Sequence, residues 1–194
     1  MRALFVLVAV LISASYVLAE TPKDTALDEG RRLGNFCSSC HGEKGYGPGQ
    51  TIPYIAGQSK DYLVNSLKDM RDKKRYSTLM QLIAQGYSDE DIEKIASWYS
   101  SQDWKNNTNT YDKKLVEKGK KLSAQCADCH GEKGYADGET PRIAGLPSPY
   151  IYYAMLEYKA GKRNSDGAGA SMSITEELSD DEIKALAEYY SSLK

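Results

Sequence analysis

Histidine and cysteine are scarce in this 194-residue chain, which has two histidines and four cysteines. Two imidazoles are too few for a multi-histidine metal site. An excess of charge is also absent, because 25 basic side chains stand against 27 acidic ones. This balance argues against nucleic acid or an anionic membrane surface as the main partner. Phenylalanine is nearly missing, with 2 residues against 15 tyrosines, so we expect tyrosine-built cores whose hydroxyls reach polar groups.

Long apolar runs are confined to the N-terminus. Arg2 precedes an apolar stretch over residues 3–19, which ends in Leu18 and Ala19 before a polar segment. The pattern is typical of a secretory signal peptide cleaved after Ala19. An uncleaved membrane anchor is the alternative, but the run is short for a bilayer span and two serines interrupt it. We therefore expect export to the periplasm, an oxidising compartment, without stable membrane insertion after cleavage.

The rest of the chain is a tandem repeat. Four segments of the first half recur in the same order in the second half: 29–47 in 117–136, 52–58 in 140–146, 61–71 in 149–159, and 88–101 in 179–192. Repetition at this period predicts two small domains of related structure. The expected organisation is a signal peptide at 1–19, an N-terminal domain at 20–102, a polar linker at 103–111 and a C-terminal domain at 112–194.

Apolar residues recur at helical spacing in both halves, and alternating strand patterns are absent, so we expect an all-α fold. Ser88 and Ser179 are predicted N-caps of the final helices, and Ser179 forms a capping box with Glu182. The other predicted helices cover 24–38, 59–71, 112–127 and 148–159, and the predicted loops cover 42–58 and 131–147.

Gly30 and Gly119 recur at the same position of the repeat, inside the first predicted helix of each domain. Glycine in a helix interior costs about 1 kcal/mol relative to alanine, so its recurrence suggests that another helix passes close by. We predict that Gly30 faces Trp98 or Tyr99, and that Gly119 faces Tyr189 or Tyr190 in the final helix.

All four cysteines and both histidines belong to two copies of one motif. The copies are Cys37-x-x-Cys40-His41 and Cys126-x-x-Cys129-His130. This is the attachment motif of c-type haem. Two thiols on one helical turn can form thioethers with the two vinyl groups of a haem, and the adjacent histidine then lies against the iron. The motifs predict two covalent haem c groups with His41 and His130 as proximal ligands.

Other sites built from the same residue types fit less well. Structural zinc prefers four nitrogen or sulfur ligands at one centre, and export works against persistent free thiols. A thioredoxin-like dithiol would need a βαβ pattern around it, and none is present. Two local disulfides would leave the repeated histidines unexplained.

The sixth iron ligand is predicted by elimination. Haem iron commonly takes histidine, methionine or cysteine, and no histidine or cysteine remains. Met80 and Met172 lie eight and seven residues before the capping serine of the final helix in their domains, and Met172 sits in a glycine- and serine-rich loop. Met70 and Met155 fall within amphipathic helices, where methionine commonly fills the core. We predict Met80 and Met172 as distal ligands, although Met80 also fits a helical turn that faces the core.

With these residues in this order, the chain resembles a tandem class I cytochrome c. The resemblance implies two domains, each wrapped around one haem. It also implies that a proline carbonyl holds each haem histidine, and the matching residues are Pro53 and Pro141. Two subfamilies fit: diheme carriers of the cytochrome c4 type, and the diheme subunit of flavocytochrome c sulfide dehydrogenase. Segments 76–99, 111–122 and 149–155 resemble the second more closely, and the glycine-rich loop at 162–172 departs from it.

The resemblance implies electron transfer, because two axial protein ligands leave no iron position for a substrate. The second subfamily implies an FAD-containing flavoprotein partner in a heterodimer that oxidises sulfide, with a soluble cytochrome or another acceptor beyond it. The chain itself carries no dinucleotide-binding motif and no spare cysteine pair, so we expect no catalytic site of its own. A stand-alone cytochrome c4-type carrier that feeds a terminal oxidase is the alternative, and a sensor module is a distant third.

Overall fold

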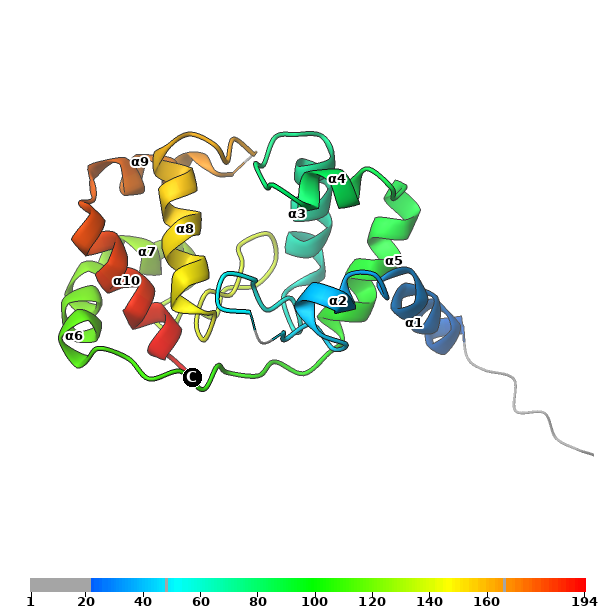
Figure 1. Cartoon of the computed structure of the whole chain (residues 1–194), viewed down its shortest axis with the longest axis horizontal. Helices are drawn as coiled ribbons and strands as arrows, with labels where there is room; N and C mark the ends of the chain where they lie inside the picture. The colour runs from blue at the N-terminus through cyan, green and yellow to red at the C-terminus, as the bar shows by residue number, and fades with distance from the viewer. Residues whose placement is uncertain (1–21, 48, 166) are drawn as a thin grey trace, which may run out of the picture.

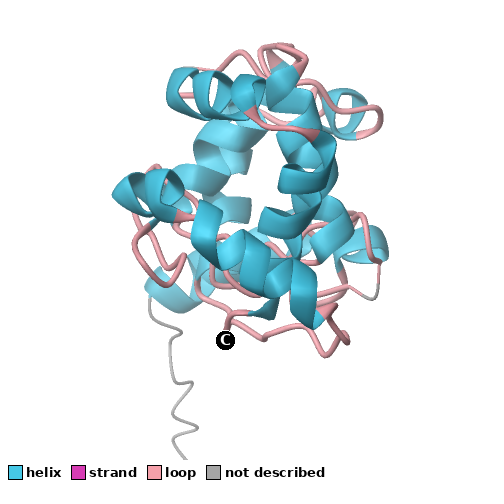
Figure 2. Cartoon of the chain, turned by 90° about the vertical axis from the view of Figure 1, so that its left-hand side faces the viewer, coloured by secondary structure: helices cyan, strands magenta, loops and turns pink. Residues whose placement is uncertain are grey.

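The structure is a computed structural model that describes residues 22–47, 49–165 and 167–194, with side chains described from residue 25 onward. The predicted signal peptide at 1–19 lies outside the described residues. The described residues form ten helices and no β-strand, which confirms the expected all-α fold class (Figure 2). None of these described helices is long and apolar enough to cross a membrane.

The helices form two lobes with the same order of elements (Figure 1). The N-terminal lobe contains α1 (Pro22–Leu33), α2 (Ser38–His41), α3 (Lys60–Arg71), α4 (Met80–Ala84) and α5 (Asp89–Ser100). The C-terminal lobe repeats them as α6 (Lys113–Leu122), α7 (Ala124–His130), α8 (Ser148–Lys159), α9 (Gly169–Glu177) and α10 (Asp180–Ser192). The predicted helices at 24–38 and 112–127 are each split by a turn into two helices.

In each lobe the first helix packs on the last, with α1 on α5 and α6 on α10. A Cβ built on Gly30 would lie 2.1 Å from the Lys94 carbonyl oxygen and 3.1 Å from the Trp98 Cβ. A Cβ on Gly119 would lie 2.1 Å from the Ala185 carbonyl oxygen and 2.7 Å from the Tyr189 Cβ. The predicted close approach at both glycines is confirmed, and no larger residue fits there without moving a helix.

The final helices begin where the sequence predicts. The Ser88 and Ser179 side chains each accept a hydrogen bond from the backbone three residues later. Both helices carry a full capping box, closed by Asp91 in α5 and by Glu182 in α10. The capping box of α5 was not part of the prediction, because the sequence rule names glutamate or glutamine at this position.

Tyrosine builds part of each core, as the composition predicts. Tyr99 is 1% exposed, and its hydroxyl donates to the Gly34 carbonyl over 3.0 Å. The equivalent Tyr190 is 2% exposed and donates to the Ser123 carbonyl over 3.4 Å. Each hydroxyl therefore joins the final helix to the turn that precedes the Cys-x-x-Cys-His motif.

α3 and α8 face each other across the centre of the molecule (Figure 1), and side chains of both helices line the cavity between them. The segments after these helices pair backbone to backbone: the Tyr76 amide donates to the Lys162 carbonyl over 3.0 Å, and the Asn164 amide donates to the Lys74 carbonyl over 2.9 Å. Side chains of Arg75 and Arg163 lie buried at this pairing.

The connection between the lobes has no helix but is held against the C-terminal lobe. Asn107 is 6% exposed, and its amide donates to the carbonyls of Gly145 and Ser191 over 2.9 and 3.1 Å. Trp104 packs on the apolar core of the C-terminal lobe. Polar residues of the segment, which predict a linker, therefore also form buried hydrogen bonds. Composition alone does not reveal these bonds.

Candidate functional site

Each Cys-x-x-Cys-His motif lies on a short helix that faces a cavity, opposite a proline-containing loop. His41 ends α2, and its Nδ1 lies 2.9 Å from the Pro53 carbonyl oxygen. His130 ends α7, and its Nδ1 lies 2.9 Å from the Pro141 carbonyl oxygen. Because a carbonyl oxygen only accepts, Nδ1 carries the proton in both rings. The lone pair of Nε2 is therefore free to bind a metal, with the ring held in orientation by the proline loop.

The proline loops are fixed by equivalent backbone hydrogen bonds. The Ile55 amide donates to the Gly45 carbonyl over 2.8 Å, and the Ile143 amide donates to the Gly134 carbonyl over 3.0 Å. Gly45 and Gly134 have φ values of 89° and 69°, a conformation that glycine adopts without strain. The same turn therefore places a carbonyl beside each histidine.

Burial adjusts the ionisation of the motif residues. It lowers the pKa of His41 and of His130, although the hydrogen bonds to the proline carbonyls act in the opposite direction. Both imidazoles are therefore neutral at neutral pH, as a metal ligand must be. Burial also raises the pKa of the Cys37 thiol to about 11, whereas Cys40 is exposed.

The cavity of the N-terminal lobe has a volume of about 920 Å³ and a largely apolar wall. This volume is within the range of cofactor pockets. The wall includes all the site residues predicted for this lobe: Cys37, Cys40, His41, Pro53 and Met80. Met70, which the sequence assigns to the core, is buried and also contributes to the wall.

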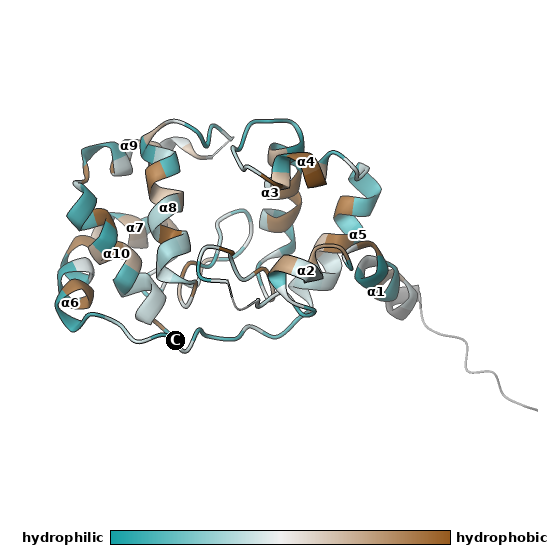
Figure 3. Cartoon of the chain, viewed as in Figure 1, coloured by the Kyte–Doolittle hydropathy of each residue, from teal (hydrophilic) through white to brown (hydrophobic). Residues whose placement is uncertain are grey.

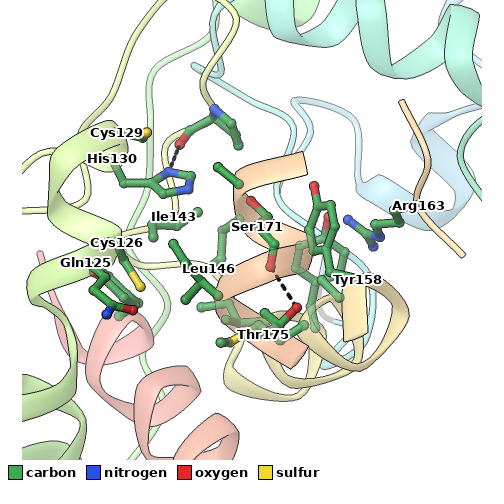
Figure 4. Close-up of a pocket in the computed structure, with 18 of the residues that line it drawn as sticks. Gln125, Cys126, Cys129, His130, Ile143, Leu146, Tyr158, Arg163, Ser171 and Thr175 are labelled. Carbon is green, nitrogen blue, oxygen red and sulfur yellow. Dashed lines mark hydrogen bonds between the residues drawn. The ribbon is translucent and has the colours of Figure 1, made fainter. Parts of the chain in front are cut away.

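The C-terminal lobe has a smaller cavity, of about 120 Å³. Cys126, Cys129, His130 and Pro141 line it, as predicted. Figure 4 shows His130 and Cys126 on one side of this cavity, with Ser171 and Thr175 of α9 on the other. The donor set of both lobes fits a haem c, because each offers two thiols, an oriented imidazole and apolar walls.

Met172 is not among the residues that line the C-terminal cavity, whereas Met155 is. The Met172 methyl group instead lies 3.9 Å from the position that a Cβ of Gly161 would take. Met172 also belongs to helix α9 and not to a loop, so the loop assigned to it is wrong. Glycine and serine are poor helix formers in isolation, and contact between α9 and α8 outweighs that preference here. The role of Met172 as distal ligand stays a prediction that its position does not support.

The two cavities share a wall. Five residues line both of them: Tyr62, Leu146, Tyr150, Ala154 and Arg163.

Two buried guanidinium groups lie at this shared wall. Arg75 donates to the hydroxyls of Ser66 and Tyr150 over 2.7 and 3.1 Å, and Arg163 pairs with Glu157 over 2.7 Å. Two guanidinium groups beside one carboxylate leave a buried positive charge, which fits the carboxylates of a haem.

The sequence analysis missed these two arginines, although a signal was present. Residues 73–77 and 161–165 align when the repeat of α3 and α8 is extended, and this alignment places Arg75 on Arg163. The same extension places Lys73, whose φ is 62°, on Gly161, whose φ is 65°. Because Arg75 and Arg163 recur at the same place of the repeat, directly after helices that line the cavities, their repetition could have identified them as site residues.

Comparison with known proteins agrees with this geometry. The family model for cytochrome c matches residues 27–103 and 116–194. Cytochrome c4 of Pseudomonas aeruginosa is 29% identical over 188 residues, which cover 91% of this chain and 92% of the relative. A protein of Stutzerimonas stutzeri named thiosulfate dehydrogenase electron acceptor is 27% identical over 169 residues, which cover 81% of this chain and 78% of the relative.

A solved structure shares the arrangement of both lobes. Reduced recombinant cytochrome c4 from Pseudomonas stutzeri superposes with a TM-score of 0.78 at 26% identity, and the match covers 87% of this chain and 98% of that chain. Since the family model spans both lobes and a two-lobed relative superposes over nearly its whole length, this chain belongs to the cytochrome c family, as a diheme electron carrier with two covalent haem c groups.

Proposed function

We propose that this protein is an exported, stand-alone diheme carrier of the cytochrome c4 type, which accepts electrons at one haem and delivers them from the other. The observation that carries the proposal is the wall shared by the two cavities. Haem iron cycles between the ferrous and ferric states and so supplies one-electron transfer. A shared wall brings the two haems close enough for exchange within one chain, without a second protein between them.

The contacts at the shared wall favour a fixed distance between the haems. Tyr62 and Arg75 come from the N-terminal lobe, and Tyr150 and Arg163 come from the C-terminal lobe. The Arg75 guanidinium donates to Tyr62 and Tyr150 over 3.3 and 3.1 Å, so one cation ties hydroxyls of both lobes. Buried polar networks of this kind hold their members in one arrangement.

The names of the relatives support a carrier more than a subunit of a flavoenzyme. The relatives described above are named as cytochrome c4 and as an electron acceptor of thiosulfate dehydrogenase. The second name supports a donor that oxidises a sulfur compound. The carrier function was the alternative in the sequence analysis, where the flavocytochrome subunit was the main prediction.

The flavocytochrome subunit is the second candidate, on the strength of one observation. Phe36, Leu79 and Leu82 line the N-terminal cavity and are 62%, 62% and 68% exposed. Figure 3 shows the apolar character of α4, which carries Leu82. An apolar rim beside one haem site suits a flavoprotein partner as well as a transient donor. The rim therefore supports entry of electrons through the N-terminal lobe.

Size-exclusion chromatography of the native holoprotein separates the two candidates. Extracts are run at low and high salt, with haem and flavin absorbance recorded together. We expect the haem to elute at the mass of a single chain and without flavin. Co-elution of flavin with haem at both salt concentrations, together with reduction of the haem by sulfide in that fraction, would contradict the stand-alone carrier and support the second candidate.

A further inference from the structure

One peptide unit links the haem histidine of the C-terminal lobe to a side chain of the N-terminal lobe. The carbonyl of this unit, from Pro141, accepts the hydrogen bond of His130 Nδ1 over 2.9 Å (Figure 4). The amide of the same unit, from Arg142, donates to the Gln58 side-chain oxygen over 3.0 Å. Two hydrogen bonds in series therefore connect the N-terminal lobe to the imidazole of His130.

The acceptor in this series, the Gln58 side chain, is held in one orientation. Its Nε2 donates to the Arg142 carbonyl over 2.8 Å while its oxygen accepts from the Arg142 amide. Only one placement of the side-chain oxygen and nitrogen satisfies both partners, because a carbonyl accepts and an N–H donates. Gln58 is 2% exposed, and the amide of the preceding Gly57 donates to the Tyr99 carbonyl over 2.9 Å. The Arg142 amide therefore has a fixed, buried acceptor.

The donor in this series, Arg142, is also fixed. Its guanidinium lies over the rings of Trp104 and Tyr135, 4.3 and 4.2 Å from their centroids. The same guanidinium donates to the Ala144 carbonyl over 3.2 Å. Cations over aromatic faces are attracted by the ring electrons, and these contacts resist a rotation of Arg142. The peptide unit cannot turn away from Gln58 without losing them.

The N-terminal lobe lacks this link, although its haem histidine has the same first partner. His41 Nδ1 lies 2.9 Å from the Pro53 carbonyl oxygen. The amide of that peptide unit belongs to Tyr54, and within the described residues it makes no hydrogen bond. The repeat places Leu146 where the first lobe has Gln58, and a leucine side chain carries no acceptor. The two proximal sites therefore differ at this one point.

The link changes the electronic character of the His130 imidazole. Hydrogen bonds in series polarise one another, and a buried setting strengthens the effect. Donation from the Arg142 amide shifts electron density of the peptide unit toward the Pro141 oxygen, which becomes a stronger acceptor. A stronger acceptor at Nδ1 makes the His130 Nε2 a more basic ligand. A more basic ligand favours ferric over ferrous iron, and second-shell hydrogen bonds are one of the ways in which a protein sets a haem potential.

We propose that Gln58 is a positioning residue for the haem of the opposite lobe. Through the Pro141–Arg142 peptide it strengthens the hydrogen bond of His130 and so lowers the reduction potential of the C-terminal haem. Gln58 acts in this way in a stand-alone carrier and in a flavoprotein subunit alike, since only the two haems of the family are required. The potential of one haem then depends on the docking of the lobes, because Gln58 reaches the peptide only across their junction.

Redox titration of the Gln58→Leu holoprotein tests the proposal, with each haem followed by its own NMR signals. The variant removes the acceptor and gives the first lobe the leucine that the second lobe has. We expect the potential of the C-terminal haem to rise and that of the N-terminal haem to stay. A merely structural role has the opposite sign, because a loosened junction admits water, which favours the more highly charged ferric haem. A fall or no change in the C-terminal potential, or an equal rise in both, would overturn the proposal.

The histidine ring protons supply a second readout. In the reduced Gln58→Leu protein the Nδ1 proton of His130 should move upfield, as expected for a weaker hydrogen bond, and that of His41 should not move. Asn65→Ala is the matched control, because Asn65 donates to Glu139 across the same junction over 3.4 Å, away from the peptide next to His130. The control should leave both protons and both potentials in place. An unmoved His130 proton in Gln58→Leu, or an equal shift in Asn65→Ala, would contradict the link.

Hydrogen exchange of the native holoprotein tests the same link without any variant, and so suffices if Gln58→Leu fails to fold. The Arg142 amide should exchange slowly, because its acceptor is buried. The Tyr54 amide, at the equivalent place of the repeat, should exchange faster. Equal exchange of the two amides would show that Gln58 does not distinguish the two proximal sites and would overturn the proposal.

Discussion

Gln58 and Arg142 join the two lobes through a reciprocal pair of hydrogen bonds. The Gln58 side-chain amide donates to the Arg142 carbonyl over 2.8 Å, and the Arg142 backbone amide donates to the Gln58 side-chain oxygen over 3.0 Å. Gln58 is only 2% exposed, so water does not replace these bonds easily. The lobes are therefore held together by specific pairing beside the haem sites as well as by apolar contact.

Replacing Gln58 by alanine should weaken this junction. The change leaves a backbone amide and a carbonyl of Arg142 without their partner, at a cost of about 1–3 kcal/mol in the free energy of unfolding. Denaturant unfolding, followed by haem absorbance and by helical circular dichroism, measures the effect. Gln85→Ala, at an exposed position, is the control and should be neutral. Equal stability of the two variants would show that the Gln58 pairing does not hold the lobes.

Gly119→Ala should separate α6 from α10. The new Cβ would lie 2.1 Å from the Ala185 carbonyl oxygen, which is part of helical backbone and cannot move alone. Overpacking of this kind costs about 1–3 kcal/mol. The denaturation midpoint should fall for Gly119→Ala and for the equivalent Gly30→Ala. Gly169→Ala is the matched control, because a Cβ at Gly169 meets no atom within 4 Å among the described residues. An unchanged midpoint in Gly119→Ala would contradict the close approach of the helices.

Asn107→Leu should release the connection between the lobes. Its amide group donates to the carbonyls of Gly145 and Ser191. An apolar replacement removes both bonds: the Ser191 carbonyl keeps the Tyr111 hydroxyl as a donor, but the Gly145 carbonyl loses its side-chain donor. The expected loss is about 1–3 kcal/mol, with increased hydrogen exchange at residues 103–111. Thr110→Ala, at an exposed position of the same segment, should change neither quantity. Unaltered exchange in Asn107→Leu would show that other contacts hold the segment.

Met80→Ala should lower the reduction potential of the N-terminal haem. A sulfur ligand favours ferrous haem, so its loss lowers the reduction potential of that haem. Redox titration followed by haem absorbance measures both steps in one experiment. Gln85→Ala, at an exposed position directly after α4 and outside the cavity wall, is the control and should leave both potentials in place. A titration of Met80→Ala that superposes on that of the native protein would contradict the role of Met80.

Local features of this protein could be predicted from its sequence because they depend on short stretches of chain. The serine caps, the two Cys-x-x-Cys-His motifs and the helix approach at Gly30 and Gly119 follow from spacing and from the repeat. The structure also places the Pro53 and Pro141 carbonyls beside the haem histidines, where the family resemblance expects them.

Contacts between the lobes could not be predicted in this way. The pairing of Gln58 with Arg142 and the burial of Asn107 depend on how two whole domains are oriented, and periodicity carries no information on that orientation. The direction of Met172 depends on a single residue of register in a segment whose composition favours a loop. Tertiary packing made that segment a helix and so decided which of its side chains faces the cavity.

Coulometric titration of the native holoprotein is the most direct test of a diheme carrier. The absorbance of the haem is followed while electrons are added and then withdrawn. We expect two electrons to be taken up per chain in resolved one-electron steps, with both returned on oxidation and all haem retained by the chain after acid extraction. Uptake of a single electron per chain, or haem that is extracted by acid, would contradict the account.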